Sequence, residues 1–160
     1  TTQSGVGKLT ALKFAREGSD LVLWDLNAAG MKKTQDSIRK IAPSVRCLTD
    51  VVDVSNTKAV YEAAKRANAW ARTYVSILVN NAGIVSGKPL LETEDSKISK
   101  TFQVNVLAHF WTVKSFLPKM ISENFGHVVT VASIAGLTAA PKMVDYGRFL
   151  NDTLRISFQK

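Results

Sequence analysis

The sequence predicts an α/β fold in which a doubly wound parallel sheet forms a single domain over residues 1–160. Short apolar runs at 21–24, 77–79 and 126–132 end at polar or small residues, as strands of parallel sheets do. We expect the run 77–79 to be buried on both faces. Segments with helical apolar spacing separate these runs, and 46% hydrophobic residues are enough for a globular core.

A helix and a strand are predicted after the opening turn. Residues 1–7 are small, and the pattern from Lys8 predicts a helix that ends near Gly18. The apolar run 21–24 predicts a strand, which Asp25 ends. The helix is expected to turn its apolar side chains inward, namely Leu9, Ala11, Leu12 and Ala15.

The same alternation continues to the middle of the chain. Apolar residues at helical spacing predict an amphipathic helix over 28–42, which Pro43 ends. The segment 45–54 predicts a strand, and Asn56 is placed to cap the helix that follows it. The run 77–79 then supplies the strand at the centre of the predicted sheet.

The second half of the chain predicts one long helix and one further strand. After a polar loop, apolar spacing predicts a helix over 101–122 with a kink or shift near Pro118. Asn105 is a polar exception within this helix, and its amide must find hydrogen-bond partners. The strand at 126–132 ends immediately before Ser133.

Composition excludes several classes of function. The net charge of +8 would suit an anionic partner, but the lysines and arginines are scattered and no nucleic-acid motif appears, so we expect no nucleic-acid partner. The single cysteine, Cys47, can form neither an internal disulfide nor a cysteine-rich metal site. No apolar stretch approaches the ~18 residues of a membrane span, and no leader pattern opens the chain. We therefore expect an intracellular, cytoplasmic location.

Two features predict a dinucleotide site. Gly5 and Gly7 precede a helix whose first N–H groups and dipole favour a phosphate. Asp25 lies twenty positions after Gly5, a spacing that places a carboxylate on a ribose 2′-hydroxyl. The same carboxylate would repel a 2′-phosphate, so it favours NAD over NADP. The alternatives are an ordinary glycine turn and an aspartate that only ends a strand.

Several spaced motifs resemble the short-chain dehydrogenase/reductase family. Residues 80–83, Asn-Asn-Ala-Gly, match its signature. Ser133 and Tyr146, thirteen positions apart, match the spacing of its catalytic serine and tyrosine, and Asn105 falls where its catalytic asparagine would.

Residues 23–27, Ile84 and residues 105–118 are most similar to the branch that contains retinol dehydrogenases and 17-beta-hydroxysteroid dehydrogenases. The resemblance covers nearly the whole chain. It implies a Rossmann-like fold with NAD along the carboxyl edge of the sheet. It also implies which residues bind NAD: Gly5, Gly7, Asp25, Asp53, Val54, Asn80 and Gly83.

The resemblance further implies the oxidation of retinol-like or steroid-like alcohols to ketones or aldehydes by hydride transfer. Tyr146 would be the acid/base, Ser133 would hold the substrate oxygen, and Asn105 would stabilise a water molecule. In the full-length family it implies association with the endoplasmic reticulum or lipid droplets, and a homodimer through the helix 101–122. No metal is implied.

Three departures from the family pattern predict an alternative. Leu150 stands where the family has the lysine that lowers the pKa of the tyrosine, which is ~10 in a free side chain. Thr1 stands where the first glycine belongs. The first strand, which would lie beside the central one, and the C-terminal substrate region are both missing from the expected pattern. The alternative is an impaired, incomplete domain that binds cofactor or a partner without catalysis.

Overall fold

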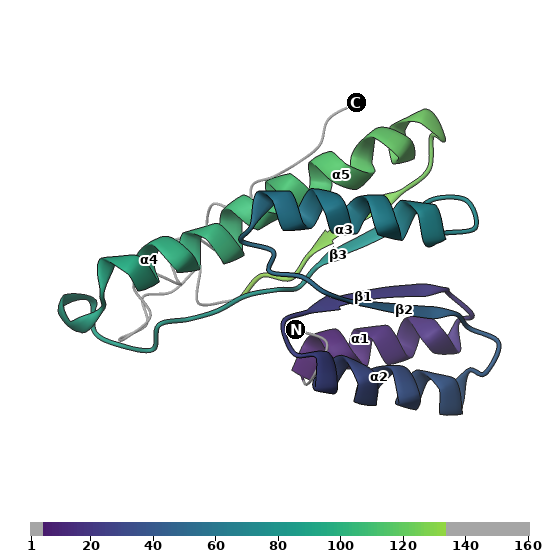
Figure 1. Cartoon of the computed structure of the whole chain (residues 1–160), viewed down its shortest axis with the longest axis horizontal. Coiled ribbons are helices and arrows are strands. Elements are labelled where there is room, and N and C mark those ends of the chain that lie inside the picture. Colours follow the sequence, from purple (N-terminus) through teal and green to yellow (C-terminus); the bar gives the residue numbers. More distant parts are fainter. Residues whose placement is uncertain (1–4, 134–160) are drawn as a thin grey trace.

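The computed structural model describes residues 5–133, and helices and strands alternate along it as the sequence predicts (Figure 1). The four strands run in the same direction, and a helix precedes each of them (Figure 1). In chain order the elements are α1 (Gly5–Arg16), β1 (Leu21–Asp25), α2 (Ala28–Ile41), β2 (Cys47–Val51), α3 (Thr57–Trp70), β3 (Ile77–Asn80), η1 (Leu90–Glu92), α4 (Asp95–Phe102), η2 (Gln103–Leu107), α5 (Ala108–Ser122) and β4 (His127–Thr130). The predicted α/β class is confirmed.

The strands form two parallel pairs. Strand β1 pairs with β2, with Leu21 opposite Cys47, and β3 pairs with β4, with Ile77 opposite His127. Within residues 5–133 no strand connects one pair to the other. The predicted parallel pairing is therefore present, but the described strands do not form one continuous sheet.

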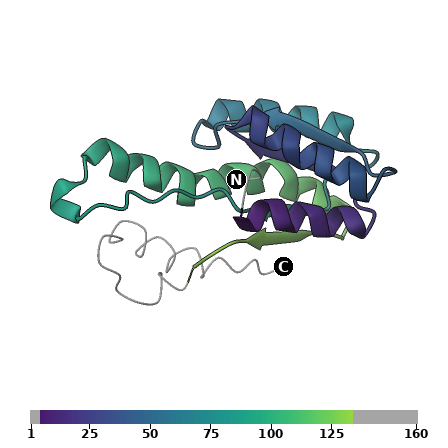
Figure 2. The ribbon, with the colours of Figure 1, turned by 90° about the horizontal axis from the view of Figure 1, so that it is seen from below.

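Helices cover the strands on two sides. Helices α1 and α2 contact each other and the β1–β2 pair, whereas α3 and α5 contact each other, with α5 against β3 (Figures 1 and 2). The two halves meet where Trp24 of β1 packs against Phe116 of α5, with their ring centroids 5.9 Å apart. None of the helices in the described part of the chain is long and apolar enough to cross a membrane.

Helix α1 packs through its small residues. Gly7, Ala11 and Ala15 recur every four positions and are buried, with Ala11 and Ala15 in a cluster that includes Leu23 of β1. The prediction that Leu9 faces inward is wrong, because its side chain is 62% exposed. A position midway between Gly7 and Ala11 lies on the opposite side of a helix. Small side chains on the buried face allow α1 to approach the strand closely.

The predicted helix over 101–122 consists of three consecutive helical segments. Helix α4 ends at Phe102, η2 is a π-helical turn, and α5 continues to Ser122 with Pro118 inside it. The hydrogen-bond register therefore changes at η2, before the proline. Such π-helical turns often occur at functional sites, and Asn105 lies within this one.

Strand β3 differs in burial from the prediction. Leu78 and Asn80 are buried, but Ile77 is 37% exposed and Val79 is only half-buried. The prediction that this run is buried on both faces is therefore wrong for the described residues. The physical reason is that α5 packs against the face of β3 that carries Leu78 and Asn80, whereas Ile77 and Val79 point to the other face.

Candidate functional site

The predicted cofactor residues lie at one edge of the fold. Because the strands run in the same direction, their carboxyl ends share an edge, where α1 also begins (Figure 1). Asp25 ends β1, Asn80 ends β3, and Asp53 follows β2 by two residues. In parallel α/β sheets, ligands bind beyond this edge.

The start of α1 has a backbone conformation that favours glycine. Gly5 has a φ of +66°, although a Cβ at this position would meet no atom within 4 Å. Backbone conformation, rather than space, therefore favours glycine there. Gly7, two residues further along the helix, is buried. Open space at Gly5 and the first N–H groups of the helix are suited to an anion.

Asp25 is tied to the start of the next helix. Its side chain is 8% exposed, and its Oδ1 accepts a hydrogen bond from the backbone N–H of Asn27 at 3.0 Å. Asn27 in turn caps α2, because its Oδ1 accepts from the N–H of Gly30 at 2.8 Å. These two bonds position the carboxylate at the strand end before any ligand arrives.

Asp53 has close partners that the sequence did not indicate. Its Oδ1 accepts from the N–H of Ser55 at 3.0 Å, and its Oδ2 accepts from Lys100 Nζ of α4 at 2.9 Å. Partial burial raises the pKa of Asp53, but the hydrogen bonds from Ser55 and Lys100 outweigh burial and hold that pKa below its ordinary value. Lys100 also bonds Ser55 Oγ, so α4 is anchored to the loop after β2. The neighbouring Val54 packs against the core.

The buried side-chain amide of Asn105 forms two hydrogen bonds with the backbone of a single residue, Ile84. Its Oδ1 accepts from the N–H of Ile84 at 2.9 Å, and its Nδ2 donates to the Ile84 carbonyl at 2.8 Å. A Cβ at Gly83 would lie 3.7 Å from Asn105 Oδ1. Asn105, 5% exposed, therefore holds the segment that follows β3 against η2. The predicted need for partners is confirmed, and the Asn-Asn-Ala-Gly turn lies beside this residue.

Of the two polar side-chain atoms of Asn80, one is hydrogen-bonded within the described residues. Its Oδ1 accepts from Thr112 Oγ1 of α5 at 2.8 Å, a contact that no sequence pattern indicated. Its Nδ2 is buried and has no hydrogen-bond partner among the described residues. Buried polar atoms are normally paired, so an unpaired amide N–H at a strand end is consistent with a ligand there.

Only part of the predicted catalytic group lies within the described residues. Ser133 follows β4 by three residues, and the N–H of Val131 donates to the Asn80 carbonyl at 2.9 Å, so this segment runs beside the end of β3. Tyr146 and Leu150 lie outside the described residues. Residues 5–133 contain no group of side chains arranged to hold a metal ion.

His109, on α5 beside this edge, is buried without partners. Its side chain is 7% exposed, and neither ring nitrogen has a hydrogen-bond partner in the described part of the chain. Desolvation lowers the pKa of His109 below its ordinary value, so the neutral ring predominates at neutral pH.

We expect this buried ring to weaken the fold on acidification. The unfolded chain binds a proton on His109 below pH ~6.5, whereas the native chain resists protonation down to its lower pKa. The free energy of unfolding should be unaffected by His109 above pH ~6.5 and should fall as the pH drops below that value. Urea unfolding from about pH 7.5 to 5 should show that fall, and His109→Gln should reduce it.

The other histidine is the matched control. His127 is exposed on β4, so His127→Gln should retain the pH dependence of the parent chain. An equal slope in His109→Gln and the parent chain would contradict the assignment to His109.

The described residues bring three features of a dinucleotide site to one edge of the fold. A glycine with positive φ begins α1, a positioned carboxylate ends β1, and an unpaired buried amide N–H lies at the end of β3. This edge of a parallel sheet has the features of a Rossmann-like nucleotide-binding domain.

Comparison with known proteins identifies the family. The family model described as short chain dehydrogenase matches residues 1–148, and the chain belongs to this family. Estradiol 17-beta-dehydrogenase 11 of Pongo abelii is 50% identical over 142 residues, and that of Homo sapiens is 49% identical. The 17-beta-hydroxysteroid dehydrogenase 13 of Mus musculus is 43% identical over 142 residues. Each alignment covers 89% of this chain and 46% of the relative, so the chain spans about half the length of these curated relatives.

Solved structures confirm the fold. NAD⁺-bound xylitol dehydrogenase matches with a TM-score of 0.85 and 27% identity, covering 96% of this chain and 58% of that one. Levodione reductase matches with a TM-score of 0.84 and 27% identity, covering 94% and 58%. The chain therefore has the short-chain dehydrogenase fold, and the family chemistry is that of an oxidoreductase using NAD or NADP.

Proposed function

We propose that this chain is the cofactor-binding part of an NAD-dependent oxidoreductase that acts on the CH–OH group of lipophilic alcohols, retinol-like or steroid-like. The observation that carries the proposal is the edge formed by Asp25, Asn80 and Asn105, each held by named hydrogen bonds. The names of the relatives, estradiol 17-beta-dehydrogenase and 17-beta-hydroxysteroid dehydrogenase, support a steroid-like alcohol or ketone as the substrate class.

The proposed cofactor contacts follow the edge from α1 to β3. Gly5 and Gly7 would approach the pyrophosphate, and Asp25 would accept a hydrogen bond from the adenosine ribose. Asp53 and Val54 would flank the adenine. Asn80 and Gly83 would contact the nicotinamide ribose, for which the unpaired Nδ2 of Asn80 is a donor. When bound, NAD supplies the hydride acceptor.

Three residues of the chain would carry the proton chemistry. Tyr146 would take the proton of the substrate hydroxyl, and Ser133 would donate a hydrogen bond to the same oxygen. Asn105 would stabilise a water molecule between the site and solvent. Its two bonds to Ile84 would keep the turn at 80–83 in place during this step.

A second candidate function rests on Leu150. A nearby lysine lowers the pKa of a tyrosine because a positive charge stabilises the phenolate. Leucine supplies no charge at this position. In this alternative the chain binds the cofactor or a partner chain and is catalytically impaired.

We also propose where the domain acts and how it assembles. The single cysteine suits a reducing, intracellular compartment, in the cytoplasm or at the surface of the endoplasmic reticulum or lipid droplets. A homodimer would form through the helix 101–122, which exposes Phe102, Leu107 and Phe110. Exposed apolar side chains of this size along one continuous helical stretch support an interface.

The first experiment is cofactor binding by the purified chain. Its melting temperature should rise with NAD and rise less with NADP at equal concentration, because ligand binding stabilises the native state. NADH formation from a panel of lipophilic alcohols then separates the two candidates. Binding with turnover supports the dehydrogenase, and binding without turnover supports the impaired domain. No stabilisation by either nucleotide would contradict both cofactor proposals.

A further inference from the structure

Three polar side chains, which we call the Asp53 cluster, bond to one another just beyond the end of β2. Oδ1 of Asp53 accepts hydrogen bonds from the backbone N–H of Ser55 at 3.0 Å and from the Ser55 hydroxyl at 2.6 Å. Nζ of Lys100, on α4, donates to Oδ2 of Asp53 at 2.9 Å and also to Oγ of Ser55. Each oxygen of the Asp53 carboxylate therefore has its own partner, and the two partners are bonded to each other.

The hydrogen bonds of the Asp53 cluster run in a fixed direction. The ammonium group of Lys100 can only donate, and the ionised carboxylate of Asp53 can only accept. Ser55 therefore accepts from Lys100 and directs its single hydroxyl proton to Asp53. An ionised carboxylate has about four acceptor sites, of which these contacts occupy three. One acceptor site on Oδ2 remains, and the bond from Lys100 sets its direction.

The Asp53 cluster lies next to the residue that we propose as the ribose contact. The backbone N–H of Val52 donates to the carbonyl of Asp25 at 3.2 Å, so the chain passes beside Asp25 one residue before Asp53. In the proposed function, Asp25 binds the adenosine ribose. The adenine attached to that ribose would then lie beside the segment that carries Asp53.

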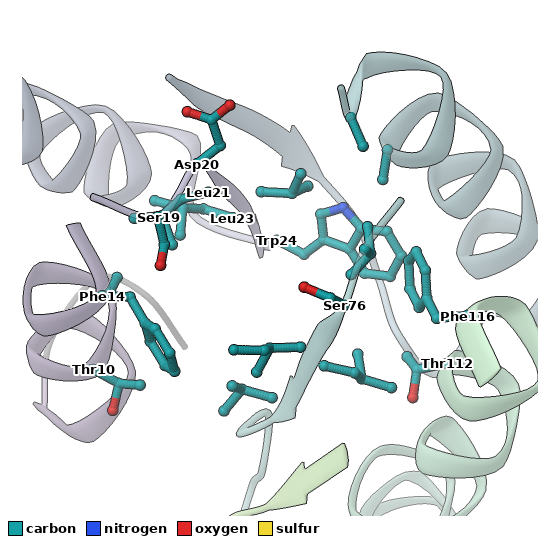
Figure 3. Close-up of a pocket in the computed structure, with 18 of the residues that line it drawn as sticks. Thr10, Phe14, Ser19, Asp20, Leu21, Leu23, Trp24, Ser76, Thr112 and Phe116 are labelled. Carbon is teal, nitrogen blue, oxygen red and sulfur yellow. The ribbon is translucent and has the colours of Figure 1, made fainter. Parts of the chain in front are cut away.

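The Asp53 cluster is separate from the largest described cavity. That cavity has a volume of about 600 Å³ and lies between β1 and β3, as Figure 3 shows in close-up. Val54 belongs to its lining, whereas Asp53, Ser55 and Lys100 do not. The bonds within the Asp53 cluster therefore do not depend on what occupies the space between β1 and β3.

Stabilisation of the fold is the competing role for Lys100. Its side chain is 43% exposed, and that of Asp53 is 37% exposed. Ion pairs this accessible contribute little to folding, because water screens the charges and a long side chain loses conformational freedom. Orientation is the larger effect. Without Lys100, Ser55 would hold Oδ1 alone, and Oδ2 could turn about the Cβ–Cγ bond, whose rotation is soft in aspartate.

We propose that Lys100 is a positioning residue for base recognition: it holds Oδ2 of Asp53 so that the remaining acceptor site meets the exocyclic amino group of adenine. This inference rests on the proposed function, in which Asp53 flanks the adenine, and adds the residue that orients the carboxylate. Hypoxanthine has a carbonyl oxygen in place of that amino group, so it would present an acceptor to an acceptor. The site should therefore prefer NAD to nicotinamide hypoxanthine dinucleotide.

Calorimetric titration of the full chain with these two dinucleotides tests the role of Lys100. The parent chain should bind NAD about 10–100-fold more tightly than the hypoxanthine analogue, which is the contribution of one hydrogen bond to a charged group. Lys100→Met should reduce this preference at least about fivefold, mainly by weakening the binding of NAD. Lys100→Arg still donates a charge-assisted hydrogen bond and should restore most of the preference. The melting temperature of Lys100→Met should stay within about 3 °C of the parent value.

Lys97 provides the matched control. It is an exposed lysine on the same helix, three positions before Lys100 and outside the Asp53 cluster. Lys97→Met removes the same charge from α4 and should retain the parent preference for NAD. A double-mutant cycle with Asp53→Ala tests the pathway of the effect. Once the carboxylate is absent, Lys100→Met should cause no further change in the preference.

The possible results distinguish this role from the proposed function. An unchanged preference in Lys100→Met, or an equal loss of affinity for both dinucleotides, would overturn the positioning role while NAD binding by the parent chain upholds the proposed function. An effect of Lys100→Met that persists in the Asp53→Ala background would also overturn the positioning role. Failure of the parent chain to bind NAD would overturn the proposed function and the positioning role together.

Discussion

Replacing Tyr146 with phenylalanine should lower the rate of NADH formation from a lipophilic secondary alcohol by about 10²–10⁴-fold. The loss follows because phenylalanine keeps the ring but cannot accept the proton of the substrate hydroxyl, and general acid–base catalysis contributes about this factor. The cofactor dissociation constant should stay the same, since the proposed binding residues lie elsewhere. Steady-state absorbance and calorimetric titration measure the two quantities.

The other two tyrosines of the chain are matched controls. Tyr74 donates a hydrogen bond to the Phe125 carbonyl at 3.2 Å, and Tyr61 lies half-buried on α3. Tyr74→Phe should cost only about 0.5–1.5 kcal/mol of stability. Both Tyr74→Phe and Tyr61→Phe should retain the parent rate of NADH formation. An unchanged rate in Tyr146→Phe would remove Tyr146 from the mechanism. A parent chain that binds NAD and shows no turnover would favour the impaired domain.

Replacing Asp25 with asparagine should weaken NAD binding by about 10–100-fold. A hydrogen bond to a charged acceptor is worth roughly 1.5–3 kcal/mol, and asparagine keeps the size of the side chain while removing its charge. Binding of NADP should become tighter, because the charge that repels a 2′-phosphate is gone. The ratio of the two dissociation constants, measured by calorimetry, should therefore approach one.

The control for this variant is a surface aspartate. Asp36 on α2 forms an exposed ion pair with Lys32 at 3.0 Å, and Asp36→Asn should leave both dissociation constants unchanged. Asp25 also accepts a bond from Asn27, so a purely structural role is the competing explanation. Equal loss of NAD and NADP binding in Asp25→Asn, together with lower thermal stability, would show that structural role.

Local sequence signals predicted most of the elements because their causes are local. The strand at 21–24 was found from its apolar run and the aspartate that ends it, and β1 ends there. Asn56 was predicted as a cap from its position before a helical pattern, and its Oδ1 accepts from the N–H of Ala59 at 3.1 Å. Asn105 was marked as a buried amide in need of partners, although the sequence could not name Ile84 as the partner.

Local sequence patterns could not predict contacts between segments that are far apart in the chain. Nothing in the sequence distinguishes Lys100 from the other helix lysines. Folding brings its Nζ within 2.9 Å of Oδ2 of Asp53, which lies forty-seven positions earlier. Leu9 was predicted to face inward because it is hydrophobic. In the structure Leu9 is exposed, and the buried face of α1 carries small residues, which allow the helix to approach its neighbours closely.

The sequence by itself determined the family, the alternation of helix and strand, and the residues at the carboxyl edge. These depend on spacing along the chain, which one sequence contains. Tertiary structure alone decided that β1 and β3 face each other across a cavity, and that His109 and Asn80 carry unpaired buried nitrogens beside it. Which strand edges are paired and which polar atoms are satisfied depend on every neighbour in space, and no local pattern encodes that.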